Sequence, residues 1–134
     1  MKAITDTGFL VAFASREDKH HVWASKLAQT ITEPLLTCEA VLAETAFHLE
    51  SAVTVLALIQ RGLVRLAFNA EGEIPRLAEL ALRYQDRSPD FADLCLIRMS
   101  ELHPRLPVIT IDASDFRVYR RNRRETIPLI VPPA

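Results

Sequence analysis

Short apolar runs alternate along the chain with longer segments in which apolar residues recur at helical spacing. The short runs predict strands at residues 2–6, 35–37, 63–68, 108–111 and 127–131. The longer segments predict helices at residues 7–13, 19–30, 38–49, 51–60, 74–84, 90–103 and 115–119. Short strands that alternate with longer helices favour an α/β fold, in which helices cover both faces of a parallel sheet.

Individual residues predict where several of these elements begin and end. Thr37 is a suitable N-cap for the helix at residues 38–49, with Glu39 in its first turn. Gly62 ends the preceding helix before residues 63–68, which form the clearest strand. Pro89 suits the first turn of the helix that follows it.

The composition indicates an ordinary globular protein. The chain has 134 residues, of which 49% are hydrophobic and 25% charged, so we expect one domain over residues 1–134. No apolar run approaches the roughly 18 residues of a membrane helix, and Asp6 interrupts the only stretch that could begin a signal peptide. Cys38 and Cys95 form no C-x-x-C pair and are expected to be reduced, buried thiols. We therefore expect a cytoplasmic protein without a membrane segment.

Four acidic residues stand out against this pattern: Asp6, Glu44, Asp93 and Asp112. Asp6 and Asp112 follow predicted strands, and ligands of parallel sheets bind outside the carboxyl ends of strands. Glu44 interrupts an apolar helix face, and Asp93 lies in the first turns of a helix, three residues after Asp90. The four residues are therefore predicted to lie at one edge of the sheet.

Each of these acids also has a purely structural interpretation. Asp6 could cap a helix, and Asp112 could cap a turn or helix. A buried arginine could neutralise Glu44, and Asp93 could belong to a solvated acidic first turn. The tripeptide Asp6-Thr7-Gly8 also matches aspartic proteases, but those enzymes are all-β and this chain is mainly helical.

Together the acids predict a site for a hard divalent cation. Carboxylates that converge without Lys or Arg repel one another, and a bound Mg²⁺ or Mn²⁺ removes that repulsion. Such ions also activate water and stabilise charge on phosphate oxygens, which is the chemistry that phosphodiester hydrolysis requires.

Five segments resemble the PIN-domain ribonucleases, and in particular the VapC-type toxins of bacterial toxin–antitoxin pairs. They are Ile4–Val11, the D-x-x-H-x-x-A segment Asp18–Ala24, Val41–Thr45, Asp90–Leu94 and Thr110–Phe116. The resemblance covers essentially the whole chain in the family's order, although Leu94-Cys95 stands where small residues are more usual.

The resemblance implies a three-layer α/β/α sandwich, a Mg²⁺ or Mn²⁺ cofactor and endonucleolytic cleavage of RNA. Asp6, Glu44, Asp93 and Asp112 would be the catalytic and metal-binding residues, with Asp90 and Asp115 as further candidates. It also implies a homodimer and, for a toxin, a cognate antitoxin protein.

A basic cluster follows the fourth acid. Arg117, Tyr119, Arg120 and Arg121 could contact RNA, with the arginines on phosphates and the tyrosine stacked on a base. The same cluster, which continues to Arg123 and Arg124, could instead be a solvated loop or an interface for an acidic partner.

One alternative function belongs to a different class. An acidic pocket could anchor Arg or Lys side chains of a partner protein in a non-catalytic interaction module. Stabilisation by Mn²⁺ separates the two functions, because a metal that binds the native state raises the melting temperature.

Overall fold

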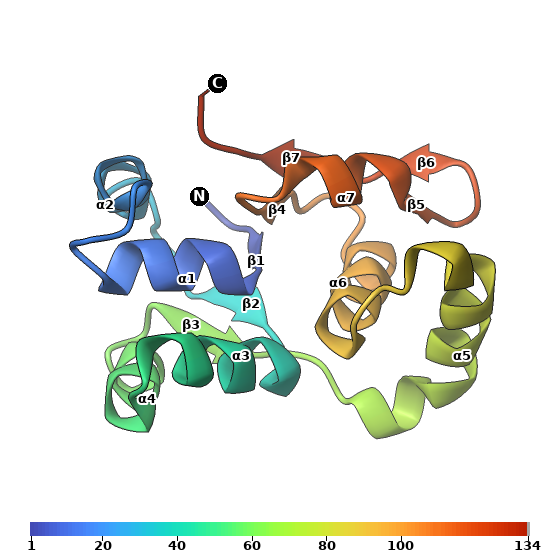
Figure 1. Cartoon of the computed structure of the whole chain (residues 1–134), viewed down its shortest axis with the longest axis horizontal. Coiled ribbons are helices and arrows are strands. Elements are labelled where there is room, and N and C mark those ends of the chain that lie inside the picture. Colours follow the sequence, from blue (N-terminus) through green and yellow to red (C-terminus); the bar gives the residue numbers. More distant parts are fainter. Residues whose placement is uncertain (134) are drawn as a thin grey trace.

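A computed structural model describes residues 1–133 and contains a five-stranded, wholly parallel sheet (Figure 1). The strands are β1 (Ile4–Thr5), β2 (Leu35–Thr37), β3 (Val64–Leu66), β4 (Val108–Ile109) and β7 (Leu129–Ile130). Their spatial order is β3-β2-β1-β4-β7, so the first strand lies at the centre. Ile4 pairs with Leu36 on one side and with Val108 on the other.

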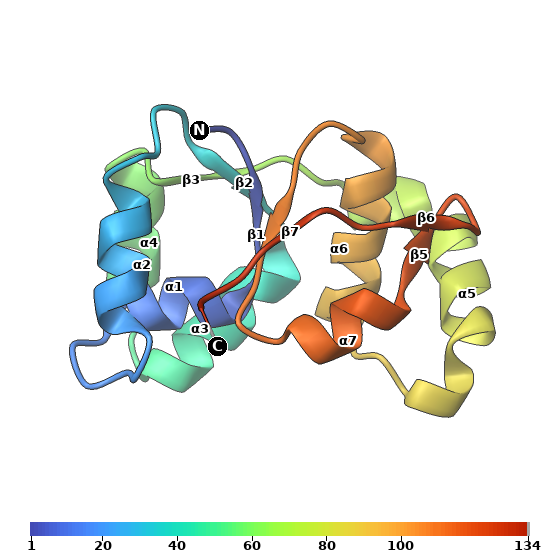
Figure 2. The same ribbon diagram turned by 90° about the horizontal axis from the view of Figure 1, so that it is seen from above.

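The helices lie on both sides of the sheet. They are α1 (Thr7–Ala14), α2 (His21–Ala28), α3 (Glu39–Leu49), α4 (Ala52–Gln60), α5 (Ile74–Arg83), α6 (Phe91–Leu102) and α7 (Ala113–Val118). Two 3₁₀ turns, η1 (Ala70–Glu73) and η2 (Gln85–Arg87), flank α5. Figure 2 shows α1 to α4 on one side of the central strands and α5 to α7 on the other. The predicted three-layer α/β/α arrangement is confirmed.

The strands are apolar because they are covered on both faces. Ile4, Leu35, Val108 and Ile109 are fully buried, as is normal for parallel strands between two helical layers. Helix α6 supplies a large part of the core that packs on them. Within residues 1–133, no helix is both long and apolar enough to span a membrane.

Three predicted helix starts are wrong, and one of them is that of α7, which begins at Ala113 instead of residue 115. Thr37 is the last residue of β2, and its hydroxyl donates to the Thr5 carbonyl oxygen at 3.0 Å, so Cys38 takes the position before α3. Helix α2 begins at His21 instead of residue 19. The Asp18 carboxylate accepts from the His20 amide at 2.8 Å, and this turn holds the preceding residues outside the helix.

The basic cluster contains a β-hairpin that was not predicted. Strand β5 (Arg120–Arg121) pairs antiparallel with β6 (Glu125–Thr126). Asn122 and Arg123 turn the chain with φ angles of 48° and 73°. The Asn122 amide donates to Glu101 of α6 at 2.7 Å, which ties the hairpin to the core.

Candidate active site

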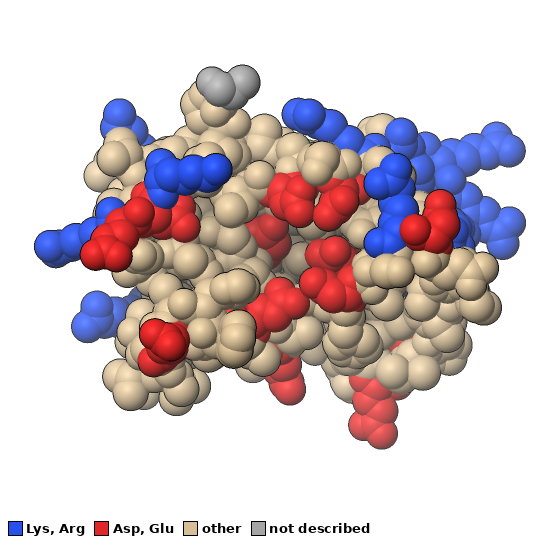
Figure 3. Space-filling model, in the orientation of Figure 1, with Lys and Arg blue, Asp and Glu red and all other residues tan. Residues whose placement is uncertain are grey.

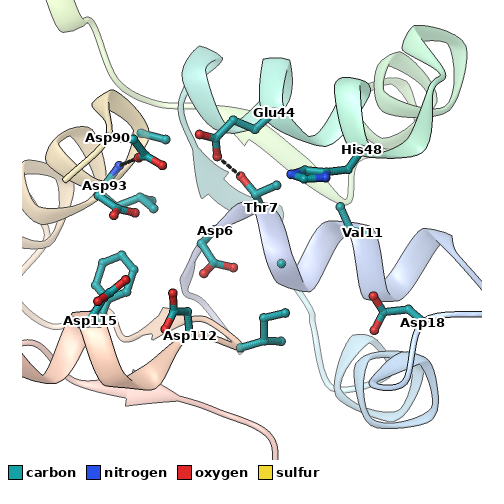
Figure 4. A pocket seen from close by; sticks show the side chains of 15 residues that line it. Asp6, Thr7, Val11, Asp18, Glu44, His48, Asp90, Asp93, Asp112 and Asp115 are labelled. Atoms are coloured by element: carbon teal, nitrogen blue, oxygen red, sulfur yellow. Dashed lines mark hydrogen bonds between the residues drawn. The ribbon is translucent and has the colours of Figure 1, made fainter. Parts of the chain in front are cut away.

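The carboxyl ends of β1 and β4 open into an acidic cleft of about 370 Å³. Its lining comes from the starts of α1, α6 and α7 and from the middle of α3. Figure 3 shows the acidic side chains as a band across the middle of this face, and Figure 4 shows them around a common opening. The acidic residues in the lining are Asp6, Asp18, Glu44, Asp90, Asp93, Asp112 and Asp115.

Asp6 is buried at the junction of β1 and α1. One of its oxygens accepts from the Phe9 amide at 3.2 Å, so the predicted helix cap is present. Burial raises the pKa of Asp6 to about 6, although hydrogen bonds from Thr110 and from the backbone of Phe9 and Gly8 lower it. Although it caps α1, Asp6 still lines the cleft, where burial makes ionisation of its carboxyl group energetically costly.

Glu44 projects from α3 toward the start of α1. It is half-buried and accepts a hydrogen bond of 2.7 Å from the Thr7 hydroxyl. Within residues 1–133, none of the ion pairs made by Lys or Arg involves Glu44, which removes the buried-arginine interpretation.

Asp90 and Asp93 stand at the start of α6. Asp90 caps the helix by accepting from the Asp93 amide at 2.8 Å. The pKa of Asp93 rises to about 7, first because of burial and then because the carboxylates of Asp90, Asp115 and Glu44 repel its charge. The Tyr119 hydroxyl donates to Asp93 at 3.4 Å and lowers the pKa slightly. The negative charges of the other acids in the cleft therefore oppose the ionisation of Asp93.

Asp112 and Asp115 lie at the start of α7. Asp112 makes no side-chain cap for that helix, but accepts from the Ser114 hydroxyl at 3.0 Å. Its backbone amide donates to the Thr110 hydroxyl at 2.9 Å. Burial, followed by the neighbouring Asp112, raises the pKa of Asp115 above its ordinary value.

The cleft requires a glycine where α1 passes the loop after β4. A Cβ atom on Gly8 would lie 2.4 Å from Cγ1 of Ile111, which is closer than atoms in contact approach. The missing side chain therefore allows the Asp6 and Asp112 segments to approach each other.

Gly8→Ala is expected to lower the free energy of unfolding by about 1–3 kcal/mol, through overpacking against Ile111. Urea denaturation measures this change. Gly72→Ala is the matched control, because the nearest atom to its added Cβ would be an ordinary 3.8 Å away. Equal stability of Gly8→Ala and wild type would show that the close approach is not a constraint.

The donor set suits a hard dication. It consists of carboxylate oxygens, and within residues 1–133 no ion pair neutralises Asp6, Glu44, Asp93 or Asp112. No three His, Cys, Asp or Glu side chains in this part of the chain form a ready-made metal-binding group. A site with fewer than three direct protein ligands is compatible with Mg²⁺, which commonly takes one or two carboxylates and retains water molecules as its other ligands.

Two side chains of the basic cluster are buried, although the sequence predicted that they contact RNA. Tyr119 is only 1% exposed and packs edge-on against Tyr84 and Phe116, so stacking on a base is ruled out. Arg121 is buried as well, with hydrogen bonds to Glu125 and to Ser100. Two of the four predicted RNA contacts are therefore wrong. Tyr84 and Phe116 enclose Tyr119, and the hairpin packs Arg121 against α6.

The other arginines of the basic cluster differ in how exposed their side chains are. The Arg120 guanidinium donates to the carbonyl oxygens of Arg117 and Tyr119 and is half-buried. The side chains that stay exposed are Arg117, Arg123 and Arg124. Figure 3 shows positive charge gathered at the hairpin end of the face, beside the acidic band.

Several cleft residues were missed or undervalued in the sequence. Thr7 holds Glu44, and the signal for it was its position directly after Asp6. His48 is exposed and lines the cleft one helical turn after Glu44. Figure 4 shows His48 of α3 beside Val11 of α1, and Asp18 at the opposite end of the opening from Asp90, Asp93 and Asp115.

Comparisons with known proteins agree with this fold. A model of the PIN domain family matches residues 3–122. The crystal structure of Mycobacterium tuberculosis VapC20, described as a sarcin-ricin loop cleaving toxin, is similar with a TM-score of 0.66. It is 21% identical, and the match covers 79% of this chain and 86% of that one. No match was found among curated proteins. Since the family model spans most of the sequence, the chain belongs to the PIN-domain family.

Proposed function

We propose that this PIN-domain protein is a metal-dependent endoribonuclease that hydrolyses RNA phosphodiester bonds. One observation supports this most strongly. Asp6, Glu44, Asp93 and Asp112 come from four separate segments and line one cleft, without ion pairs to Lys or Arg in residues 1–133. Carboxylates kept together at this electrostatic cost suit a cation and the chemistry it assists.

Hydroxyl groups orient three of these acids. Thr7 holds one oxygen of Glu44, Tyr119 one oxygen of Asp93 and Ser114 one oxygen of Asp112. A carboxylate held through one oxygen keeps the other for a ligand. Mg²⁺ or Mn²⁺, when bound, would neutralise charge on phosphate oxygens and activate water.

The surface beside the cleft suits a polyanion. An acidic site repels RNA unless positive charge nearby compensates. Exposed Arg117, Arg123 and Arg124 supply that charge near α7 and the hairpin, and we propose them as phosphate contacts. In this proposal they replace the buried Tyr119 and Arg121.

The test is cleavage of RNA by the purified protein. We expect cleavage with Mg²⁺ or Mn²⁺ and none in EDTA. Cleavage that persists in EDTA would contradict metal dependence, and intact RNA at millimolar metal would contradict the activity.

A second measurement separates this function from a non-catalytic interaction module. Between the ordinary carboxyl pKa of 3.8 and the raised values of about 6 for Asp6 and about 7 for Asp93, the folded protein binds more protons than the unfolded chain. Metal-free stability should therefore fall as the pH rises from about 4 to about 8. Mn²⁺ should raise the melting temperature more at pH 8 than at pH 5, because protons compete with it at low pH. No shift at millimolar Mn²⁺ at pH 8 would favour the interaction module.

We also propose that the protein is the toxin of a toxin–antitoxin pair and forms a homodimer. The similar fold of VapC20 supports the first part. Exposed Phe47, Val53 and Leu56 on α3 and α4 support a protein partner on that side. Light scattering tests the dimer: we expect twice the chain mass, and a single-chain mass at micromolar concentration would contradict it.

A further inference from the structure

The two cysteines, which the sequence separates widely, lie side by side in the fold. Cys38 precedes α3 and is 2% exposed, while Cys95 lies in α6 and is 1% exposed. Both thiols are free and line one cavity, and each is the largest cause of the shift in the other's pKa, which is lowered for Cys38 and raised for Cys95. The expected burial is confirmed, but the adjacency was not predicted.

A second cavity gives access to this pair. It measures about 440 Å³, and both cysteines line it together with Glu39, Phe68, Asn69, Glu71 and Phe91. It shares no lining residue with the acidic cleft. Helix α6 therefore separates two sites, with Asp93 facing the cleft and Cys95 facing the cavity. A small oxidant such as hydrogen peroxide can enter a cavity of this size.

We propose that Cys38 and Cys95 are a modification site, where a peroxide oxidises the two thiols to an intramolecular disulfide that joins the start of α3 to α6. One cysteine sulfur attacks a peroxide oxygen, the O–O bond breaks, and a sulfenic acid forms with release of water (or of an alcohol from an alkyl peroxide). The second sulfur then attacks the first, the S–O bond breaks, and a molecule of water leaves. Each sulfur loses one electron and one proton, and the peroxide takes up both electrons.

The surroundings favour a disulfide over a thiolate metal site. A soft metal ion would need further ligands beside the two sulfurs. Within residues 1–133, no group of three potential metal ligands of the His, Cys, Asp or Glu type exists. Two adjacent thiols without a third ligand are suited to form a bond with each other.

The bond would alter the acidic cleft, an effect that rests on the proposed nuclease function. A disulfide holds its sulfurs about 2.05 Å apart, against about 3.5–4 Å for atoms in van der Waals contact. Its formation must draw together α3, which holds Glu44, and α6, which holds Asp93. Because displacements near 1 Å can cost about a hundredfold in rate, we expect oxidation to lower RNA cleavage by about tenfold to a hundredfold.

The experiment treats the folded full-length protein with hydrogen peroxide and analyses it by mass spectrometry without reduction. We expect the loss of two hydrogen atoms, a peptide linking Cys38 to Cys95, and full reversal by dithiothreitol. Cys38→Ala and Cys95→Ala are the matched variants, and each should give a single sulfenic acid that dimedone traps. Dimedone adducts on both wild-type cysteines, disulfides between chains, or oxidation only in urea would overturn the proposal.

RNA cleavage is measured separately from disulfide formation. Reduced wild type and both alanine variants should cleave RNA equally, and only wild type should lose activity reversibly with peroxide. A linked peptide with unchanged cleavage would overturn the coupling to the cleft. If the reduced protein does not cleave RNA, the nuclease proposal fails, while the mass measurement still decides whether the disulfide forms.

Discussion

Asp93→Asn should abolish RNA cleavage while leaving the metal-free protein at least as stable as wild type at pH 8. The pKa of Asp93 is raised to about 7 by burial and by the charges of Asp90, Asp115 and Glu44, so the ionised side chain is destabilising when no cation is present. Asparagine has nearly the same shape, still accepts a hydrogen bond from Tyr119, and carries no charge. A residue that lowers stability when charged is best explained by a role in binding or catalysis.

The expected loss of activity is large. Metal-assisted stabilisation of phosphate charge contributes several kcal/mol, which corresponds to at least about a 10³-fold lower rate. Cleavage of RNA with Mn²⁺ and thermal unfolding in EDTA measure the two effects on the same preparation. Asp86→Asn is the matched control, because Asp86 is exposed in η2 and does not line the cleft. An active Asp93→Asn variant, or an inactive one that has lost stability, would contradict this account of the residue.

Glu101→Gln is expected to destabilise the fold most. Glu101 has a side chain only 1% exposed and accepts from Arg76 at 2.9 and 2.6 Å, from Arg98 at 3.2 Å and from the Asn122 amide at 2.7 Å. It therefore joins α5, α6 and the β5–β6 hairpin. Burial opposes its ionisation, but these hydrogen bonds hold its pKa below the ordinary value.

Removing the charge leaves two arginines without their shared partner. We expect a loss of about 3 kcal/mol, at the low end for buried pairs because Arg76 and Arg98 stay 19% and 24% exposed. Urea denaturation measures it, with Glu79→Gln as control. Glu79 also pairs with Arg76, but it is 62% exposed and should contribute under about 1 kcal/mol.

The pH dependence provides a second check on Glu101. Because the pKa is lower in the folded state, the stabilisation is present above the ordinary value of 4.5 and is lost as the pH falls below it. The difference between wild type and Glu101→Gln should therefore shrink in acid. A difference that is constant from pH 7 to pH 3 would show that charge is not its source.

The sequence predicts the elements of this fold better than the contacts between them. Strand positions and the place of Asp6 and Asp112 follow from local patterns, since carboxyl ends of parallel strands meet at one edge. Tyr119 among arginines looked accessible, yet Tyr84 and Phe116 enclose it. Tyr84 comes from a distant segment that a local pattern does not include.

Turn chemistry explains the missed hairpin. Two-residue strands carry almost no periodic signal, and the turn uses Asn122 and Arg123 at positive φ instead of the usual Asn-Gly or Asp-Gly. The adjacency of Cys38 and Cys95 likewise depends on how α3 packs against α6. Contacts of this kind, between residues far apart in the chain, cannot be predicted from the spacing of residues in the sequence.

The central claim is that these carboxylates form a metal site. Measuring the binding of Mn²⁺ to the free protein, by electron paramagnetic resonance of the unbound ion, tests it most directly. Wild type should remove Mn²⁺ from solution at pH 8 and release it when Mg²⁺ is added in excess. Asp6→Asn should bind it at least about tenfold more weakly. Wild-type protein that leaves all Mn²⁺ free at millimolar concentration, or an Asp6→Asn variant with unchanged affinity, would contradict a metal site built by these carboxylates.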